Sequence, residues 1–193
     1  MCQDDERVKE LEVQLALANF KLELLQEITL LMTESLDPKQ TLDFIMDRIF
    51  ALVEMEAASV LIYDESGEQL EFIRVRGGKE EELLGFKMDC THGIAGKALA
   101  AGETVLLQDA CTDPAFFGEL DTIFGYKTQT LIAVPLKIAG RTLGVLEGVN
   151  IASDETQSPE SLIELFECLA SLISMTIVTA RLLEQAGLKN IDL

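Results

Sequence analysis

The residues best suited to chemistry in this chain lie close together in its middle third. His92 is the only histidine among the 193 residues, and Cys90 stands two positions before it. A histidine beside a thiol could serve as a metal ligand, a haem ligand or a general base. A single histidine makes a multi-ligand site hard to build. We therefore expect His92 to be a polar or exposed residue at the start of a helix.

The cysteines show no pattern typical of a metal site or a disulfide framework. Cys111 lies in the irregular stretch DACTDPAF, and it would become a redox-sensitive thiol only if a cation or a helix end lowered its pKa. No cation adjoins it in the sequence. Cys2, Cys90, Cys111 and Cys168 form no CxxC pair and no metal-ligand spacing, so we expect neither a disulfide nor a bound metal.

Familiar catalytic motifs do not rise above chance in this sequence. We find no Ser/His/Asp order, paired-carboxylate signature or Walker-type loop, and the segment GIAG lacks the spacing of the dinucleotide fingerprint. The sequence therefore predicts no catalytic residue and no enzyme activity, and it leaves the cofactor unknown.

Composition and charge exclude several classes of partner. The formal net charge is −19, which opposes contact with nucleic-acid phosphates and with anionic lipid surfaces. Hydrophobic residues make up 48% of the chain, but apolar runs are interrupted early, so we expect a globular protein without membrane insertion. The start MCQDDERVKELE lacks the features of an export signal, which favours the cytoplasm.

The first 36 residues have the pattern of a long amphipathic helix. Residues 7–32 contain no Pro or Gly, and their apolar or small side chains follow alternating steps of three and four at Val8, Leu11, Leu15, Ala18, Leu22 and Leu25. This spacing predicts a coiled-coil seam. Further apolar residues at Leu17, Leu24, Ile28 and Leu31 indicate that the helix also packs in a bundle. A lone helix folded back on its own domain remains the alternative.

Two further long helices are expected beside the first. Asp37 and Pro38 are typical of a helix start, and that helix should run to about Glu56. Ser158 and Pro159 start a last helix with a near-heptad apolar stripe, which Gly187 ends. We expect a homodimer whose interface includes Val8, Leu11, Leu15, Leu22 and Leu25 of the first helix and Leu169, Ile173 and Ala180 of the last.

The region between these helices has the pattern of an antiparallel sheet. Alternating or apolar runs predict strands from Ala57, at 69–76, at 104–107, at 130–138 and at 142–150, with the last two joined as a hairpin by residues 139–141. A short edge strand could form within LLGFKM, after a solvated acidic loop at 80–82. Gly93 and Gly96 suit the tight start of a helix that Gly102 closes. The order is not a βαβ alternation, so we predict an α+β fold.

Taken in order, these segments resemble the GAF domain, a sensory module related to PAS domains. The resemblance rests on GIAGKALAAGE, VLLQDA, TDPAF, TLIAVPLKIAGRTLGVLEGVN and SPESLIELFECLASLIS, and it covers residues 38–183. It implies a six-stranded antiparallel sheet with terminal helices packed on one face. On the other face, loops and short helices around residues 90–127 would cover a ligand pocket. We divide the chain into a dimerisation helix (1–36), a GAF core (37–157), a C-terminal helix (158–187) and a tail (188–193).

The best-known GAF chemistries are only partly matched by these residues. Cyclic-nucleotide-binding members end the second ribbon strand with Asn-Lys, whereas Ile151 follows Asn150 here, so we interpret Asn150 as a strand-end residue that bonds its own backbone. Bilin-binding members attach the chromophore through Cys-His, but Thr91 separates the two residues here. GAF-type methionine sulfoxide reductases carry cysteines at positions occupied here by Ala95 and by Gly125 and Tyr126.

The leading hypothesis is a sensory or regulatory GAF domain that binds an unidentified small ligand and signals through dimeric terminal helices. A ligand-free dimeric scaffold for a signalling partner protein is the alternative, and a thiol-dependent redox sensor or reductase is disfavoured. Aromatic residues around 116–126 could line the pocket or fill it equally well. The candidate pocket residues are Cys90, Thr91, His92, Ile94, Ala95, Asp109, Cys111, Phe116, Phe117, Phe124, Tyr126, Thr128, Thr130, Glu147 and Asn150.

Overall fold

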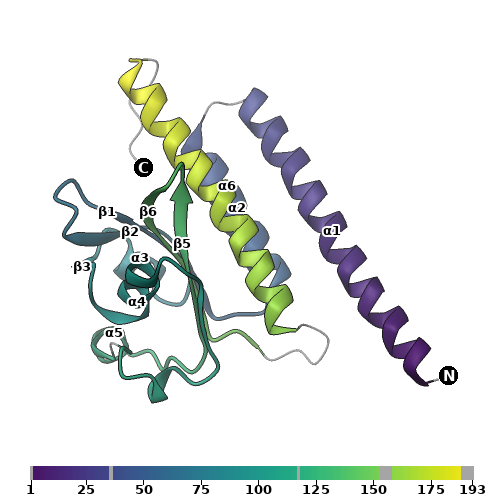
Figure 1. Cartoon of the computed structure of the whole chain (residues 1–193). Helices are drawn as coiled ribbons and strands as arrows, with labels where there is room; N and C mark the ends of the chain where they lie inside the picture. Colours follow the sequence, from purple (N-terminus) through teal and green to yellow (C-terminus); the bar gives the residue numbers. More distant parts are fainter. Residues whose placement is uncertain (1, 35–36, 117, 153–157, 188–193) are drawn as a thin grey trace.

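The chain folds into one antiparallel sheet with long helices on one face and short helices and loops on the other (Figure 1). A computed structural model describes residues 2–34, 37–116, 118–152 and 158–187. The strand order is β3-β2-β1-β6-β5-β4, and every neighbouring pair is antiparallel. The predicted α+β fold is therefore confirmed. The strands are β1 (Ala57–Tyr63), β2 (Gln69–Gly77), β3 (Lys87–Asp89), β4 (Val105–Leu107), β5 (Leu131–Ile138) and β6 (Arg141–Val149).

Two of the helices begin where a side chain of the local sequence satisfies a backbone N–H group of the first turn. The helices are α1 (Cys2–Glu34), α2 (Pro38–Leu52), α3 (Glu80–Leu83), α4 (Gly93–Ala101), α5 (Glu119–Phe124) and α6 (Pro159–Gln185), with a 3₁₀ turn at Ala110–Thr112. The Asp37 side chain accepts from the Lys39 N–H and the Ser158 hydroxyl accepts from the Ser161 N–H, while proline occupies the first turn of both α2 and α6. Residues 35–36 of the expected break, and the predicted tail 188–193, lie outside the described residues.

Two segments differ from the sequence-based expectation. Helix α2 ends at Leu52 rather than near Glu56, because Val53 turns to extended backbone and the Glu56 N–H then donates to the Val149 carbonyl beside the sheet. Residues 80–83 form the short helix α3 instead of a loop, although their side chains are largely exposed as expected. The turn between β5 and β6 forms the predicted hairpin. Ala139 and Gly140 both have positive φ angles, as a two-residue turn of this type requires.

The core on the helical face explains why α6 is so apolar. Phe166, Leu169 and Ile173 are fully buried against α2 and the sheet, and Ala180 is 1% exposed. Leu169, Ile173 and Ala180 therefore belong to the interior of the chain and not to a dimer interface, which corrects the expectation from their heptad spacing. Among the described residues, α6 alone has the length and hydropathy to span a membrane, but 56% of that apolar window is buried inside the protein.

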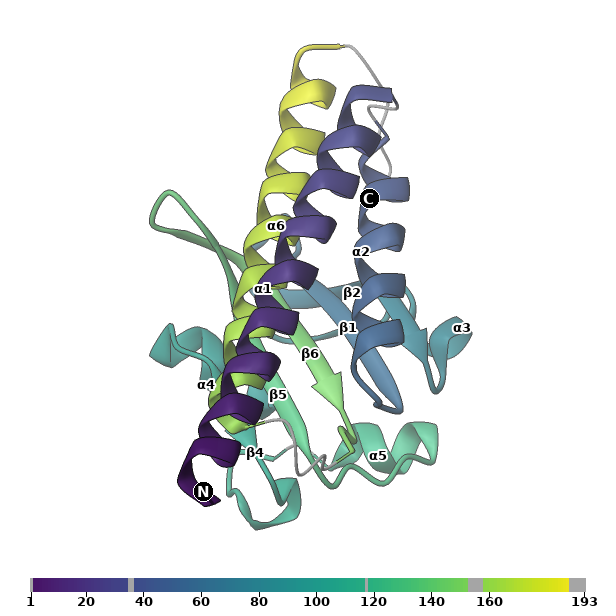
Figure 2. The same cartoon turned by 90° about the vertical axis from the view of Figure 1, so that its right-hand side faces the viewer.

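Among the described side chains of helix α1, those that pack on the rest of the chain lie in its second half. Leu24 and Ile28 are buried against α2 and α6, and Lys21 pairs with Glu164 of α6 at 3.4 Å. Every side chain described between Arg7 and Asn19 is exposed. In Figure 1 this half of α1 stands apart from α6, and Figure 2 shows α1 running along the outside of the helical layer. The fold-back alternative thus applies to half of the helix.

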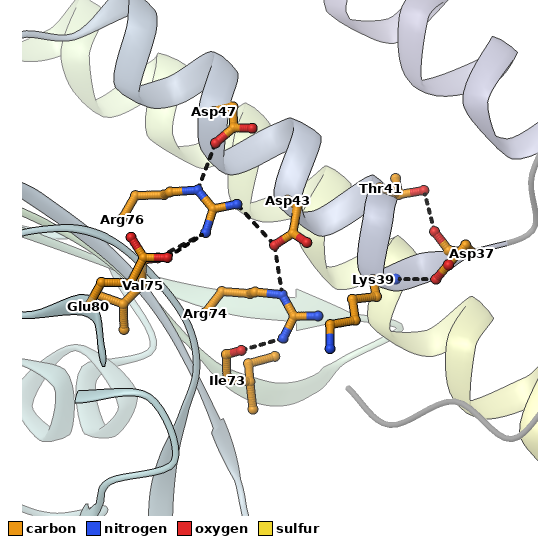
Figure 3. A network of polar contacts seen from close by, with 10 residues as sticks. All are labelled: Asp37, Lys39, Thr41, Asp43, Asp47, Ile73, Arg74, Val75, Arg76 and Glu80. Atoms are coloured by element: carbon orange, nitrogen blue, oxygen red, sulfur yellow. Dashed lines mark hydrogen bonds and ion pairs between the residues drawn. The ribbon is translucent and has the colours of Figure 1, made fainter. Parts of the chain in front are cut away.

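Strand β2 is tied to α2 by a cluster of charges on the helical face (Figure 3). The Arg74 Nε atom lies 3.0 Å from an Asp43 carboxylate oxygen, and Arg76 Nη2 lies 3.1 Å from the same oxygen. Arg76 also pairs with Asp47 at 2.7 Å and with Glu80 at 3.2 Å. A register shift between β1 and β2 at Val60 accompanies this arrangement, as β-bulges re-aim side chains.

Asp43 should be the most costly member of this charge cluster to neutralise. Asp43→Asn leaves the Arg74 side chain, which is only 7% exposed, without a carboxylate partner. We expect a loss of roughly 1–3 kcal/mol in the free energy of unfolding, below the range for fully buried pairs because Asp43 itself is 35% exposed. Chemical denaturation of the wild-type protein and the Asp43→Asn variant measures this difference in the free energy of unfolding.

Asp47→Asn is the matched control, because Asp47 is 65% exposed and pairs with Arg76, whose side chain is more exposed than that of Arg74. It should cost under about 1 kcal/mol. Equal losses for the two variants would show that burial of Arg74 does not set the cost.

Candidate functional site

A cavity lies on the sheet face opposite α2 and α6. Its volume is about 100 Å³, and its walls are mostly apolar. The floor comes from β1, β2 and β6, and the cover comes from α4, α5 and the loops beside them. The lining residues are Ala57, Ser59, Phe72, Val75, Leu83, Met88, Gly93, Ile94, Ala95, Phe116, Leu120, Asp121, Phe124, Tyr126, Thr128, Leu131, Glu147 and Val149.

The alternation of β6 places one carboxyl group in this cavity. Leu146 packs in the helical core, whereas Glu147 and Val149 line the cavity, as expected for neighbouring residues of a strand. Glu147 stands directly opposite Ser59 of β1 and Ala133 of β5. Because both cross-strand neighbours are small, the sheet leaves open space around the Glu147 side chain.

The start of α4 is pressed against the preceding loop, which brings its apolar side chains onto the sheet. A Cβ at Gly96 would lie 2.4 Å from the carbonyl carbon of Thr91, so only glycine allows this approach. Ile94 and Ala95 are consequently buried at 3% and 2% exposure and form one wall of the cavity. Gly102 closes α4 in the left-handed conformation, in agreement with the sequence.

Aromatic side chains close the opposite wall. The ring of Phe124 packs edge-on against Phe86, with ring centroids 5.4 Å apart. Tyr126 lies so close over Gly78 that a Cβ there would meet its hydroxyl oxygen at 2.1 Å. Asp121 fastens this wall, because its carboxylate accepts from both the backbone N–H and the hydroxyl of Thr128, each at 2.7 Å.

Glu147 is the polar centre of the cavity. Burial raises its pKa to about 7, and the opposing influence is a hydrogen bond from the Ser59 side chain. The Glu147 side chain is half-buried, and it lines the cavity. None of the described residues that line the cavity is a lysine or an arginine, so this lining supplies no cation to Glu147.

The structure brings together about half of the candidate pocket residues. Ile94, Ala95, Phe116, Phe124, Tyr126, Thr128 and Glu147 line the cavity. The contributions of Ser59 and Asp121 were missed. Ser59 is a polar residue within an apolar strand, and this pattern could have indicated a residue that faces a pocket. The position of Asp121 depends on tertiary contacts that no local pattern reveals. Phe117 lies outside the described residues.

The three candidate residues just before α4 do not line the cavity, contrary to expectation: Cys90, Thr91 and His92. The hydroxyl of Thr91 donates to the Asp89 carboxylate at 2.5 Å, so it serves the turn. His92 is exposed at the N-terminal end of α4 and its side chain makes no capping bond. The thiol of Cys90 lies 3.8 Å from the Gly67 carbonyl oxygen, which turns it toward the β1–β2 connection.

Two residues of the next segment also lie outside the cavity. Asp109 is exposed at the start of the 3₁₀ turn, where its backbone carbonyl accepts from the Thr112 hydroxyl. Cys111 is exposed, and its thiol lies 3.6 Å from the Thr128 carbonyl oxygen. Both therefore support the loop behind the cavity wall.

Asn150 and Thr130 hold the loop that carries Thr128. The Asn150 side-chain oxygen accepts from the Gln129 N–H at 2.6 Å, and its amide nitrogen donates to the Lys127 carbonyl at 2.9 Å. The predicted self-bonding of Asn150 is thus replaced by bonds to another segment. The Thr130 hydroxyl accepts from the Ile151 N–H at 2.7 Å. Neither residue lines the cavity, and both position its wall from behind.

Comparison with known proteins assigns the family. The family model described as the GAF domain matches residues 37–177, well over half of the chain, so this chain belongs to the GAF family. It is 24% identical over 161 residues to a Nif-specific regulatory protein of Herbaspirillum seropedicae, covering 82% of this chain and 30% of that protein. It is 29% identical to a probable 3',5'-cyclic phosphodiesterase of Caenorhabditis elegans, covering 51% of this chain and 15% of that protein. The chain thus spans less than a third of either relative.

Solved structures agree with the GAF fold. The GAF domain of a phosphoenolpyruvate-protein phosphotransferase from Coxiella burnetii matches with a TM-score of 0.73 and 20% identity, covering 87% of this chain and 98% of that one. A free methionine-R-sulfoxide reductase from Neisseria meningitidis matches with a TM-score of 0.65 and 19% identity, covering 84% and 90% of the two chains. At these identities the likeness concerns the fold. GAF domains are typically sensory or regulatory, and the family also includes enzymes.

Glu147 should make the stability of the protein depend on pH. Its pKa is about 7 in the folded chain against an ordinary 4.5, so the folded state keeps the proton at pH values where the unfolded state has lost it. Stability therefore falls as pH rises from about 4.5 to about 7, by a total on the order of 3 kcal/mol. Glu147→Gln should remove this component, as measured by denaturant unfolding at about pH 5 and about pH 8.

Glu65→Gln provides the control, because Glu65 is exposed in the turn after β1. It should leave the difference between the two pH values as in the wild type. A Glu147→Gln protein with an unchanged pH difference would mean that Glu147 is ionised as readily as an exposed carboxyl group.

Proposed function

We propose that this chain is a sensory GAF module that binds a small ligand in the cavity around Glu147 and reports its occupancy through paired terminal helices. The observation that carries the proposal is a mostly apolar cavity of about 100 Å³ in which Glu147 is the one carboxyl group that the described strands place at the floor. Small-molecule sites are commonly apolar hollows with a few placed polar groups. The ligand is unidentified, and the proposal concerns regulation rather than catalysis.

The size of the cavity narrows the choice of ligand. Pockets for drug-sized ligands usually measure about 300–1,000 Å³, whereas this cavity measures about 100 Å³. A cyclic nucleotide would not fit without outward movement of α4 and α5. The similarity to a probable cyclic-nucleotide phosphodiesterase therefore supports a sensory GAF module in this chain, and it does not support a cyclic nucleotide as the ligand.

Strand β2 provides a route from the cavity to the helices. Phe72 and Val75 line the cavity, while Arg74 and Arg76 of the same strand pair with α2 on the opposite face. A ligand that displaces β2 would alter the spacing of these pairs and so shift α2 against α6. Such coupling requires that the ligand binds the two arrangements with different affinity.

The exposed seam of α1 supports pairing with a second copy of the chain. Val8, Leu11, Leu15, Leu22 and Leu25 are between 43% and 62% exposed, and they form one stripe that avoids the buried Leu24 and Ile28. Heptad stripes on two identical helices match each other in register, so a second copy covers this stripe without any change of sequence. An apolar stripe of this kind is typical of an interface.

A scaffold that recruits a signalling partner without a ligand is the second candidate. It is favoured by the aromatic packing at the cavity wall, where Phe86 lies between Phe72 and Phe124 with ring centroids 6.3 Å and 5.4 Å away. In that case the cavity would be a packing defect, and only the helices would carry function. Signalling partners would then bind in the presence and absence of any small molecule.

A reductase-like activity has weaker support. None of the described residues lining the cavity is a cysteine, although thiols carry out the chemistry of that class. Cys90, Cys111 and Cys168 are free thiols, which suits the reducing cytoplasm that we propose as the location.

Occupancy of the cavity can be tested directly. Native mass spectrometry of freshly purified protein should show a bound small molecule, and Ala57→Ile should remove it, because three extra carbon atoms then project into the cavity from β1. Leu52→Ile is a control on the exposed end of α2. The scaffold hypothesis would be favoured if the wild-type protein carries no bound ligand and if no compound in a ligand screen raises its stability.

Dimerisation through α1 can be tested by one charge. Leu15→Glu places a carboxylate in the middle of the exposed seam and should raise the dimer dissociation constant at least about tenfold, since a charge at such a position loses its solvation on pairing. Sedimentation equilibrium measures the constant.

Ala16→Glu adds the same charge one position outside the seam, on a residue that is also exposed. It should leave the dissociation constant near its original value. If both variants dimerise like the wild type, or the wild type is a monomer, pairing through α1 is wrong.

A further inference from the structure

Among the described residues that line the cavity, Glu147 offers a carboxyl group that a ligand can reach. Asp121 and Glu147 are the acidic residues that line the cavity. Both oxygens of Asp121 already accept hydrogen bonds from Thr128. Glu147 has the Ser59 side chain as its hydrogen-bonding neighbour. A ligand in the cavity therefore meets a carboxyl group with unused acceptor capacity.

The charge of the lining disfavours anions and favours cations. Two acidic side chains and no lysine or arginine appear among the described lining residues. An anionic ligand would place like charges together in a medium of low dielectric constant, which is costly. A cation would pair with Glu147, and hydrogen bonds between opposite charges are shorter and stronger than neutral ones.

The remaining walls select the carbon part of the ligand. Ile94, Phe116 and Val149 offer carbon surface around the carboxyl group. An apolar cavity of about 150 Å³ holds benzene, which has six carbon atoms. The present cavity of about 100 Å³ is smaller and has room for roughly four to six non-hydrogen atoms.

We propose that the cavity selects a small organic cation, with one protonated nitrogen that donates to Glu147 and Ser59 and a compact hydrocarbon part that contacts Ile94 and Phe116. This inference rests on the proposed function, because it assumes that the cavity is a ligand site. It adds the chemical class of the ligand. Burial of the Glu147 pair away from water makes the charge of the nitrogen the main determinant of selectivity.

The test compares two probes of nearly equal shape, isobutylamine and isobutanol, at about pH 8, where the amine is protonated. Binding is followed by NMR titration and by the rise in melting temperature. Wild-type protein should bind the amine roughly tenfold or more tightly than the alcohol, since a charge-assisted bond distinguishes them. Glu147→Gln keeps the shape of the side chain and should abolish this preference.

Two controls separate selectivity from folding. Continued binding of isobutanol by Glu147→Gln would show that the variant retains its fold and its cavity. Ala57→Ile fills space at the end of β1, away from the Ser59–Glu147 pair, and should weaken binding of both probes. Glu65→Gln, an exposed change in the turn after β1, should leave amine binding unchanged.

Each other outcome overturns a defined statement. Equal affinity of wild-type protein for the amine and the alcohol, or an amine preference that survives Glu147→Gln, overturns the selection of a cation while the ligand site itself stands. Failure of the wild-type protein to bind either probe overturns both this inference and the proposed function of the cavity.

Discussion

The structure depends on strand β6 near the centre of the sheet, because one face of this strand packs in the helical core and the other lines the cavity. On β6, Leu146 packs in the helical core, and a Cβ at Gly148 would lie 2.8 Å from the ring of Phe166. The alternate residues Glu147 and Val149 face the cavity. A side chain at Gly148 would push α6 away from the sheet, so the close packing of one face fixes the register that presents Glu147 on the other. The site and the helical core are therefore parts of one constraint.

This shared strand register limits how a ligand can act. The core around Phe166 and Ile173 is fully buried and close-packed, so the sheet cannot bend freely under α6. The charge cluster between β2 and α2 is more adaptable, because Asp47 and Glu80 are 65% and 47% exposed. Ion pairs of this kind exchange partners at little cost. Coupling energies between sites are typically about 1–3 kcal/mol, a range that the rearrangement of a few such pairs can supply.

The sequence predicted the layout of the fold because its signals are local. Asp37 and Ser158 cap helices through bonds to residues two or three positions ahead, and Ala139 and Gly140 form a turn by their own backbone angles. The heptad spacing of α6 led to a wrong prediction of a dimer interface, because a helix that packs inside its own chain can have the same spacing. Leu169 and Ile173 are buried within the chain. The spacing of apolar residues shows that a helix has an apolar face, but it does not show which surface covers that face.

The candidate site was only half predictable for a related physical reason. Glu147 was identifiable as a charged residue within an apolar strand, but the open space beside it exists because Ser59 and Ala133 stand opposite in neighbouring strands. That pairing joins residues far apart in the chain. Conversely, Cys90 and His92 were attractive for their chemistry, yet His92 is exposed and the Cys90 thiol lies beside the Gly67 carbonyl, so neither lines the cavity. Reactive side chains mark a site only where the backbone leaves room for a second molecule, and here that room lies beside a carboxyl group.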